Sequence, residues 1–125
     1  MQVHRENITV PQGTTYRQKL YYVFPNGDPI PLHDFTACMQ IREYVEAPEV
    51  LYKSEYGSDI VIEAEAGAIY LRIPSSKTER WDWLRGVYDI ELTSPHGQTT
   101  RIMEGRVRVT PNVTRACSAV GSGRR

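Results

Sequence analysis

Residues that could carry acid–base, metal or nucleophilic chemistry are few and scattered along the chain. The histidines His4, His33 and His96 fall near the start, in a proline-rich stretch and in a Pro-His-Gly turn, and no two have the spacing of paired metal ligands. Serines occur beside prolines in turn and cap contexts, and the chain has no G-x-S-x-G motif. We therefore predict no catalytic residue, no metal site and no cofactor, and we interpret the histidines as surface-loop residues.

Asp89 and Glu91 are two carboxylates whose spacing places both on one face of a strand. Such a pair could share acid–base work, but the polar face of an amphipathic strand accounts for it more simply. The glycines are single and separated, so no phosphate-binding loop is predicted. The residues give no basis for an enzyme.

Two tryptophans, Trp81 and Trp83, leave two interpretations open. Trp81 is three residues from Leu84, so on a helical turn the two side chains would share a face and could close one open end of a β-sandwich. Alternatively, Trp81 and Trp83 form an exposed aromatic platform for a sugar or a base. Large aromatic side chains are mostly core material, which favours the first interpretation.

Charge is distributed unevenly although its total is zero, with 15 basic and 15 acidic side chains. The neutral total argues against a nucleic-acid coat or a polybasic membrane module. The charged residues of 43–65 are all acidic except Lys53, whereas the end of the chain is rich in arginine. The arginines expected to contact protein partners are Arg106, Arg108, Arg115, Arg124 and Arg125. Either the acidic stretch of one copy meets the basic stretch of another, or both are ordinary solvated faces.

Short strand patterns interrupted by Pro and Gly predict an all-β sandwich over residues 1–112. The expected strands are residues 6–10, 15–24, 36–44, 50–56, 60–62, 67–73, 86–93 and 99–109. Ser76 and Glu79 have the form of a capping box, which predicts one short helix over 76–84. The last two strands form a hairpin in which Gly105 marks a bulge or the close approach of another chain. Residues 113–125 are expected to be a flexible tail or an arm that a partner orders.

Two stretches resemble small virion proteins of tailed bacteriophages. Residues 24–42, FPNGDPIPLHDFTACMQIR, are similar to their D-x-G-x-P-x-x-L and T-A-x-M-x-I-R pattern. Residues 86–114, GVYDIELTSPHGQTTRIMEGRVRVTPNVT, are similar to their Y-D-x-E-L, P-x-G and G-x-V-x-V ending. Related arrangements occur in N-terminal domains of baseplate upper proteins and in collar proteins.

This resemblance implies an immunoglobulin-like antiparallel β-sandwich with one short helix and no catalytic residues. It also implies a structural protein, present in many copies on a ring or stalk at the neck, tail or baseplate, with other phage virion proteins as partners. The chain would be made in the host cytoplasm and end in the virion, without nucleic-acid or membrane partners. A carbohydrate or host-surface binding module using Trp81 and Trp83 is the alternative.

Overall fold

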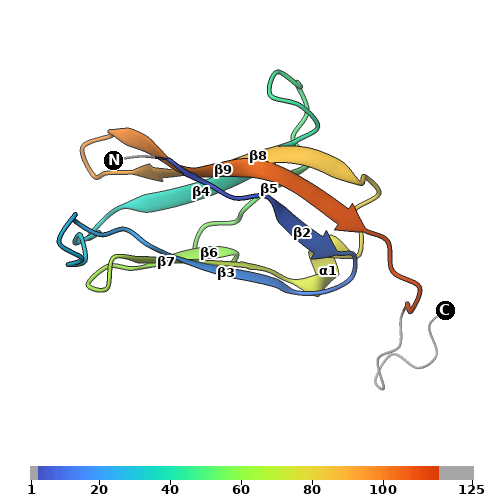
Figure 1. Cartoon of the computed structure of the whole chain (residues 1–125), viewed down its shortest axis with the longest axis horizontal. Coiled ribbons are helices and arrows are strands. Elements are labelled where there is room, and N and C mark those ends of the chain that lie inside the picture. Colours follow the sequence, from blue (N-terminus) through green and yellow to red (C-terminus); the bar gives the residue numbers. More distant parts are fainter. Residues whose placement is uncertain (1–2, 116–125) are drawn as a thin grey trace.

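Two β-sheets pack face to face in the computed structural model, which describes residues 3–115 (Figure 1). The larger sheet has the strand order β1-β9-β8-β4-β5, with β2 also paired to β9, and the smaller has the order β3-β7-β6. The strands are β1 (His4–Arg5), β2 (Ile8–Pro11), β3 (Tyr16–Tyr21), β4 (Thr36–Arg42), β5 (Tyr52–Lys53), β6 (Ile60–Glu63), β7 (Ala68–Ile73), β8 (Arg85–Thr93) and β9 (Thr99–Thr110), and the short helix is α1 (Ser75–Thr78). The predicted all-β sandwich with one short helix is confirmed.

The core lies between the sheets and follows the period-2 pattern of the sequence. Alternate side chains of a strand point to opposite faces, so one set of each strand is buried. The inward residues of β4, β7 and β8 are Ala37, Met39, Ile41, Ile69, Leu71, Ile73, Tyr88, Ile90 and Leu92, and all are buried. The alternate residues of these strands are left for the outer faces, where any contact with a partner must take place.

The β8–β9 hairpin is the longest paired element and forms the centre of the larger sheet. Ser94 and Gln98 close its turn through a 2.9 Å backbone hydrogen bond, and Gly97 adopts a positive φ of 85° there. The register shifts between Ile90 and Glu91, which is the mark of a β-bulge. The predicted hairpin is thus confirmed, and its bulge lies closer to the turn than Gly105.

Gly105 allows the N-terminal segment of the same chain to approach β9 closely. β1 and β2 run parallel to β9, while the other strand pairs are antiparallel. A Cβ at position 105 would collide with the backbone carbonyl of Glu6. The Tyr88 hydroxyl, opposite Gly105, donates a 2.6 Å hydrogen bond to that carbonyl, and the side-chain oxygen of Asn7 accepts one from the Arg106 N–H at 3.0 Å. A close approach at Gly105 is therefore confirmed, but it is made by this chain's own N-terminal segment and not, as predicted, by another chain.

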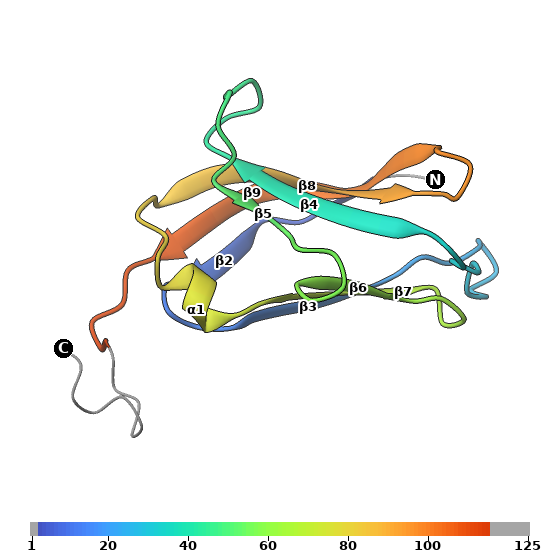
Figure 2. The same ribbon diagram turned by 180° about the vertical axis from the view of Figure 1, so that it is seen from behind.

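Helix α1 lies at one end of the sandwich, between the two sheets (Figure 2). Its N-cap residue is Pro74 and no side chain caps it, so the predicted Ser76 capping box is wrong: Ser76 lies inside the helix. The helix ends at Thr78, and the chain then continues without helical periodicity. Trp81 consequently turns into the core at 7% exposure, whereas Leu84 is 54% exposed. The prediction that Leu84 shares a buried face with Trp81 is wrong for that reason.

Candidate functional site

The outer face of the larger sheet carries its polar side chains in rows set by the strand register. Along β9, the outward positions run from Glu104 to Arg106 and Arg108. On β8 these three face Asp89, Val87 and Arg85, respectively. On β4, Gln40 continues the row of Asp89, and Arg42 continues the row of Val87. The face therefore has a carboxylate-bearing part toward the hairpin turn and an arginine-rich part at the opposite end.

The carboxylate-bearing part neutralises its own charge. Asp89 and Glu104 lie directly opposite each other, an arrangement that is unfavourable when nothing bridges it. The Arg101 guanidinium lies 3.4 Å from Asp89 and 3.0 Å from Glu104, and Arg5 lies 3.2 Å from Glu104. A hydrogen bond to Glu104, together with the charge of Asp89, raises the pKa of Arg101. The like charges in this row are thus satisfied within the molecule.

The arginine-rich part has no such partners. Arg85 and Arg108 lie directly opposite each other and are both exposed, and Arg106 is exposed in the next row. Within residues 3–115, no carboxylate lies within ion-pair distance of Arg85, Arg106 or Arg108. Like charges directly opposite on a sheet destabilise it. This cluster of Arg85, Arg106 and Arg108, called the arginine cluster below, therefore gains more from an external anionic partner than from anything in the described chain.

An acidic loop, residues 43–50, borders the same face. It connects β4 to β5 and projects from the larger sheet on the side away from the smaller sheet (Figure 1). Arg42 holds it by donating a 2.7 Å hydrogen bond to the Ala47 carbonyl, and the Ala47 N–H donates one to the Tyr44 carbonyl at 3.0 Å. Ala47 is buried, and these contacts attach the loop to the end of β4.

The exposed side chains of this loop combine negative charge with apolar surface. Glu43, Glu46 and Glu49 are exposed and form no ion pair with any residue in the range 3–115. Tyr44 is 52% exposed and Val45 74% exposed. A loop with an apolar tip flanked by unpaired carboxylates has the composition of a contact element.

Between the acidic loop and β9 lies an open groove of about 530 Å³. Val45 of the loop lines one side, Arg106 lines the other, and Val87 and Arg42 lie between them. Cys38 and Gln40 extend it along β4. The groove has no nucleophile–base–orienter constellation, but its mixed apolar and charged lining suits the side chains of a protein partner.

The interface residues expected from the sequence fall into three groups. Arg106 and Arg108 lie on the outer face as anticipated, and Arg115 is exposed beyond the end of β9. Arg124 and Arg125 lie outside the described residues. Sequence reasoning missed Arg85 and the contact character of the acidic loop. Arg85 is two residues before Val87, in the outward phase of the strand, and that signal could have found it.

The rings of Trp81 and Trp83 contact each other, but they do not both lie on the surface. Their ring centroids are 4.7 Å apart, and Trp81 also makes an edge-on contact with Tyr52 at 5.6 Å. Trp81 is buried, while Trp83 is half-buried and its Nε1 has no hydrogen-bond partner among the described residues. A sugar ring could reach Trp83 alone, so the aromatic platform of Trp81 and Trp83 lacks one of its two rings.

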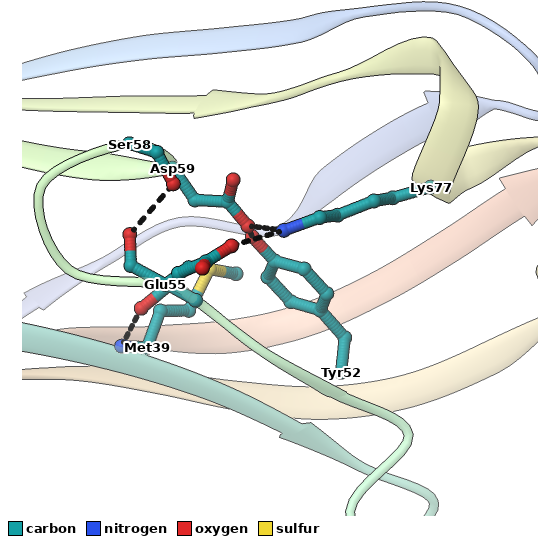
Figure 3. A network of polar contacts seen from close by, with 7 residues as sticks. Met39, Tyr52, Glu55, Ser58, Asp59 and Lys77 are labelled. Carbon is teal, nitrogen blue, oxygen red and sulfur yellow. Dashed lines mark hydrogen bonds and ion pairs between the residues drawn. The ribbon is translucent and has the colours of Figure 1, made fainter.

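A second polar cluster, Tyr52, Asp59 and Lys77, lies between the sheets near α1 (Figure 3). The Asp59 carboxylate, exposed by only 3%, accepts hydrogen bonds from the Lys77 ammonium at 2.7 Å and from the Tyr52 hydroxyl at 2.5 Å. Its backbone N–H donates to the Glu55 carbonyl at 2.8 Å, and its own carbonyl accepts from the Arg72 N–H at 2.6 Å. Each polar group of Asp59 is therefore paired.

The ionisation of this cluster follows from the same contacts. Burial alone would raise the pKa of the Asp59 carboxyl, but the hydrogen bonds from Lys77 and Tyr52 outweigh burial and hold that pKa below its usual 3.8. The hydrogen bond to Asp59 raises the pKa of Lys77 above its usual 10.5. Burial, together with the hydrogen bond to Asp59, raises the pKa of Tyr52. The cluster is a buried carboxylate paired with Lys77, which also lies 3.4 Å from Glu55, and it ties together β5, the segment before β6, and α1.

Among residues 3–115, no group of three or more His, Cys, Asp or Glu side chains could hold a metal ion. His4 contacts only Glu6 on the surface, and His33 and His96 are exposed. In the described range, no helix has the length and apolar character needed to cross a membrane.

Comparison with models of protein families and with curated proteins gives no match for this chain. The fold and the outer face of the larger sheet are therefore the basis on which its function is argued.

Proposed function

We propose that this chain is a non-enzymatic structural protein of a tailed-bacteriophage particle, an adaptor or decoration at the neck, tail or baseplate. In this proposal it acts through protein–protein contacts made by the outer face of the larger sheet. The observation that carries the contact role is that the arginine cluster, which has no carboxylate partner among the described residues, shares its face with the exposed and unpaired carboxylates of the acidic loop.

A protein partner fits this surface better than a nucleic acid does. Asp89, Glu91 and Glu104 occupy the same face, and the acidic loop borders it, so a continuous phosphate backbone would meet negative charge along the sheet. A protein can instead place carboxylates over the arginine cluster and apolar side chains over Val45 and Val87. Arginine is also over-represented at protein interfaces because its planar fork binds carboxylates through two hydrogen bonds.

The phage assignment is supported by the resemblance of residues 24–42 and 86–114 to virion proteins. Both stretches are built into the larger sheet, as β4 and as the β8–β9 hairpin. The immunoglobulin-like topology, the location in the virion and the presence of multiple copies belong to this proposal, as do contacts from Arg115, Arg124 and Arg125 in the tail.

Mass spectrometry of purified, nuclease-treated phage particles tests the proposal. The chain is expected as a stoichiometric component that remains with the particles after a density gradient. A chain found only in the unassembled lysate fraction would contradict a virion role. Particles assembled with Arg106→Glu/Arg108→Glu protein are expected to carry less of the chain, although the isolated domain stays folded.

A further inference from the structure

The acidic loop and the arginine cluster lie on one face, at the same level along the strands. The loop leaves β4 after Arg42, which is in register with Val87 on β8 and, through it, with Arg106 on β9. Arg85 and Arg108 form the next row toward that end. The loop is thus on the β4–β5 side of the face, and the arginine cluster is on the β8–β9 side.

Within one molecule these opposite charges do not meet. Neither Glu43, Glu46 and Glu49 nor Arg85, Arg106 and Arg108 form an ion pair inside the range 3–115. The groove with Val87 between them keeps the two groups apart. The loop also projects from the larger sheet (Figure 1), and its residues Glu43, Glu46 and Glu49 are exposed.

A two-fold axis parallel to the strands, lying above the face near β8, exchanges the two sides of the sheet and keeps the level along the strands. It therefore carries the acidic loop of one copy over β9 of the other. This one operation places both acidic loops, one on each copy, so the loop–arginine contact is made twice, as in an isologous pair. The geometry points to a dimer of this chain in which the acidic loop of each copy lies against Arg106 and Arg108 of the other.

The apolar groups of the face support the same arrangement. Tyr44 and Val45 at the loop tip are more than half exposed, and the groove beside β9 is open and lined in part by Val87. Pairing would cover these groups together with the charges. Apolar groups at the centre with charges around them are the usual composition of a protein interface.

This inference rests on the proposed function, since it uses the same surface, but it can fail separately. A chain that is present in particles and monomeric in solution would overturn the pairing and leave the virion role standing. A chain that dimerises but is absent from particles would overturn the virion role and leave the pairing standing.

Sedimentation of the purified full-length chain at low and high salt tests the pairing. The wild-type protein is expected to dimerise at about 0.05 M salt and to weaken at about 0.5 M, where screening is much shorter-ranged. Arg106→Glu/Arg108→Glu and Glu43→Lys/Glu46→Lys/Glu49→Lys should each raise the dimer dissociation constant at least about tenfold, because each places like charges in contact. A wild-type chain that stays monomeric at low salt overturns the inference.

Mixing the two charge-reversed variants gives the sharpest result. The acidic loop of the first variant then meets native arginines of the second, and the basic loop of the second meets the new glutamates of the first. A heterodimer should form from two proteins that are each monomeric alone. No heterodimer, or species larger than two chains, would contradict a two-fold pair.

The matched control is Arg17→Glu/Arg72→Glu, which reverses a second exposed cross-strand arginine pair, on the smaller sheet. It changes the same number of charges on the opposite side of the sandwich and should leave the dimer dissociation constant within about twofold of wild type. Loss of the dimer in this control would show that total charge, rather than the proposed face, governs association.

Discussion

The buried cluster around Asp59 and the arginine cluster on the larger sheet differ in whether their charges are paired within the chain. Asp59 is 3% exposed, and both its carboxylate and its backbone groups are hydrogen-bonded within the chain. Arg85, Arg106 and Arg108 are exposed, and no carboxylate pairs with them in the described part of the chain. Removing one partner of an internally paired, buried charge destabilises the fold, whereas a like-charged pair on the surface is relieved when an opposite charge binds to it.

The largest expected effect is on the internally paired side of this comparison. Asp59→Ala removes the acceptor of Lys77 and Tyr52, and the buried Tyr52 hydroxyl loses its partner. Because hydrogen bonds to a charged group contribute roughly 1.5–3 kcal/mol each and Lys77 can turn to water, we expect a loss of about 3 kcal/mol in the free energy of unfolding. Urea denaturation followed by circular dichroism measures it.

Asp82→Ala is the matched control, because Asp82 is exposed. Its free energy of unfolding should stay within about 0.5 kcal/mol of wild type. Equal losses in the two variants would show that the Asp59 cluster does not hold the fold.

The next largest effect on the free energy of unfolding is expected at Gly105, on the strand that carries Arg106 and Arg108. Gly105→Ala adds a methyl group that collides with the Glu6 carbonyl, so β1 must move away from β9. We expect a loss of about 2 kcal/mol, in the range of overpacked sites, with faster hydrogen exchange at the Glu6 N–H that bonds to the Glu104 carbonyl. Wild-type stability and unchanged exchange in Gly105→Ala would contradict the close approach.

The pH dependence of stability is a further test of the buried cluster around Asp59. The pKa of Asp59 is held below its usual 3.8 in the fold, so its contribution is present above that value and is lost as pH falls through the lower, folded pKa. The pKa of Lys77 is raised above 10.5, so its contribution is present below 10.5 and lost as pH rises through the folded pKa.

Thermal unfolding as a function of pH checks this. Wild type should lose stability below pH about 4 more steeply than Asp59→Asn, while Arg108→Gln, which adds no carboxylate, should lose stability as steeply as wild type. If the unfolding temperatures of wild type and Asp59→Asn fall equally as pH is lowered, Asp59 does not contribute to the pH dependence of stability.

The smallest effect, and the one of opposite sign, is on the open side of the comparison. Arg108→Glu turns the Arg85–Arg108 pair into an opposite-charge pair, which should stabilise the isolated domain by up to about 1 kcal/mol. Arg101→Glu removes the cation that bridges Asp89 and Glu104 and should destabilise it by about 0.5–1 kcal/mol. Thermal unfolding followed by circular dichroism at low salt, at protein concentrations below the dimer dissociation constant, compares the two.

Much of the fold could be predicted from the alternation of the sequence. The inward positions of β4, β7 and β8 and the β8–β9 hairpin follow directly from period 2 and from Pro and Gly at turns. A short helix was predicted at the right point of the chain, but it spans Ser75–Thr78 rather than residues 76–84, and its cap and the burial of Leu84 were predicted wrongly. The helix ends after one turn, and a spacing of three residues has no meaning beyond that end.

The candidate surface was predicted only in part. Arg106 and Arg108 could be assigned to an outer face because they alternate with Val107 and Val109 on one strand. Two other features, the absence of carboxylate partners for them among the described residues and their position level with the acidic loop, depend on the register among β4, β8 and β9. This register joins residues far apart in the sequence. For the same reason, the N-terminal segment that approaches Gly105 could not be identified in advance.

One measurement tests the central claim most directly: sedimentation equilibrium of Arg108→Glu at low salt, together with its thermal unfolding. The claim is that Arg108 serves a partner rather than the fold. It predicts that Arg108→Glu is a monomer at low salt. It also predicts that in high salt, where both proteins are monomers, the variant unfolds at or above the unfolding temperature of the wild type. A dimer as tight as wild type, with a lowered unfolding temperature, would contradict it.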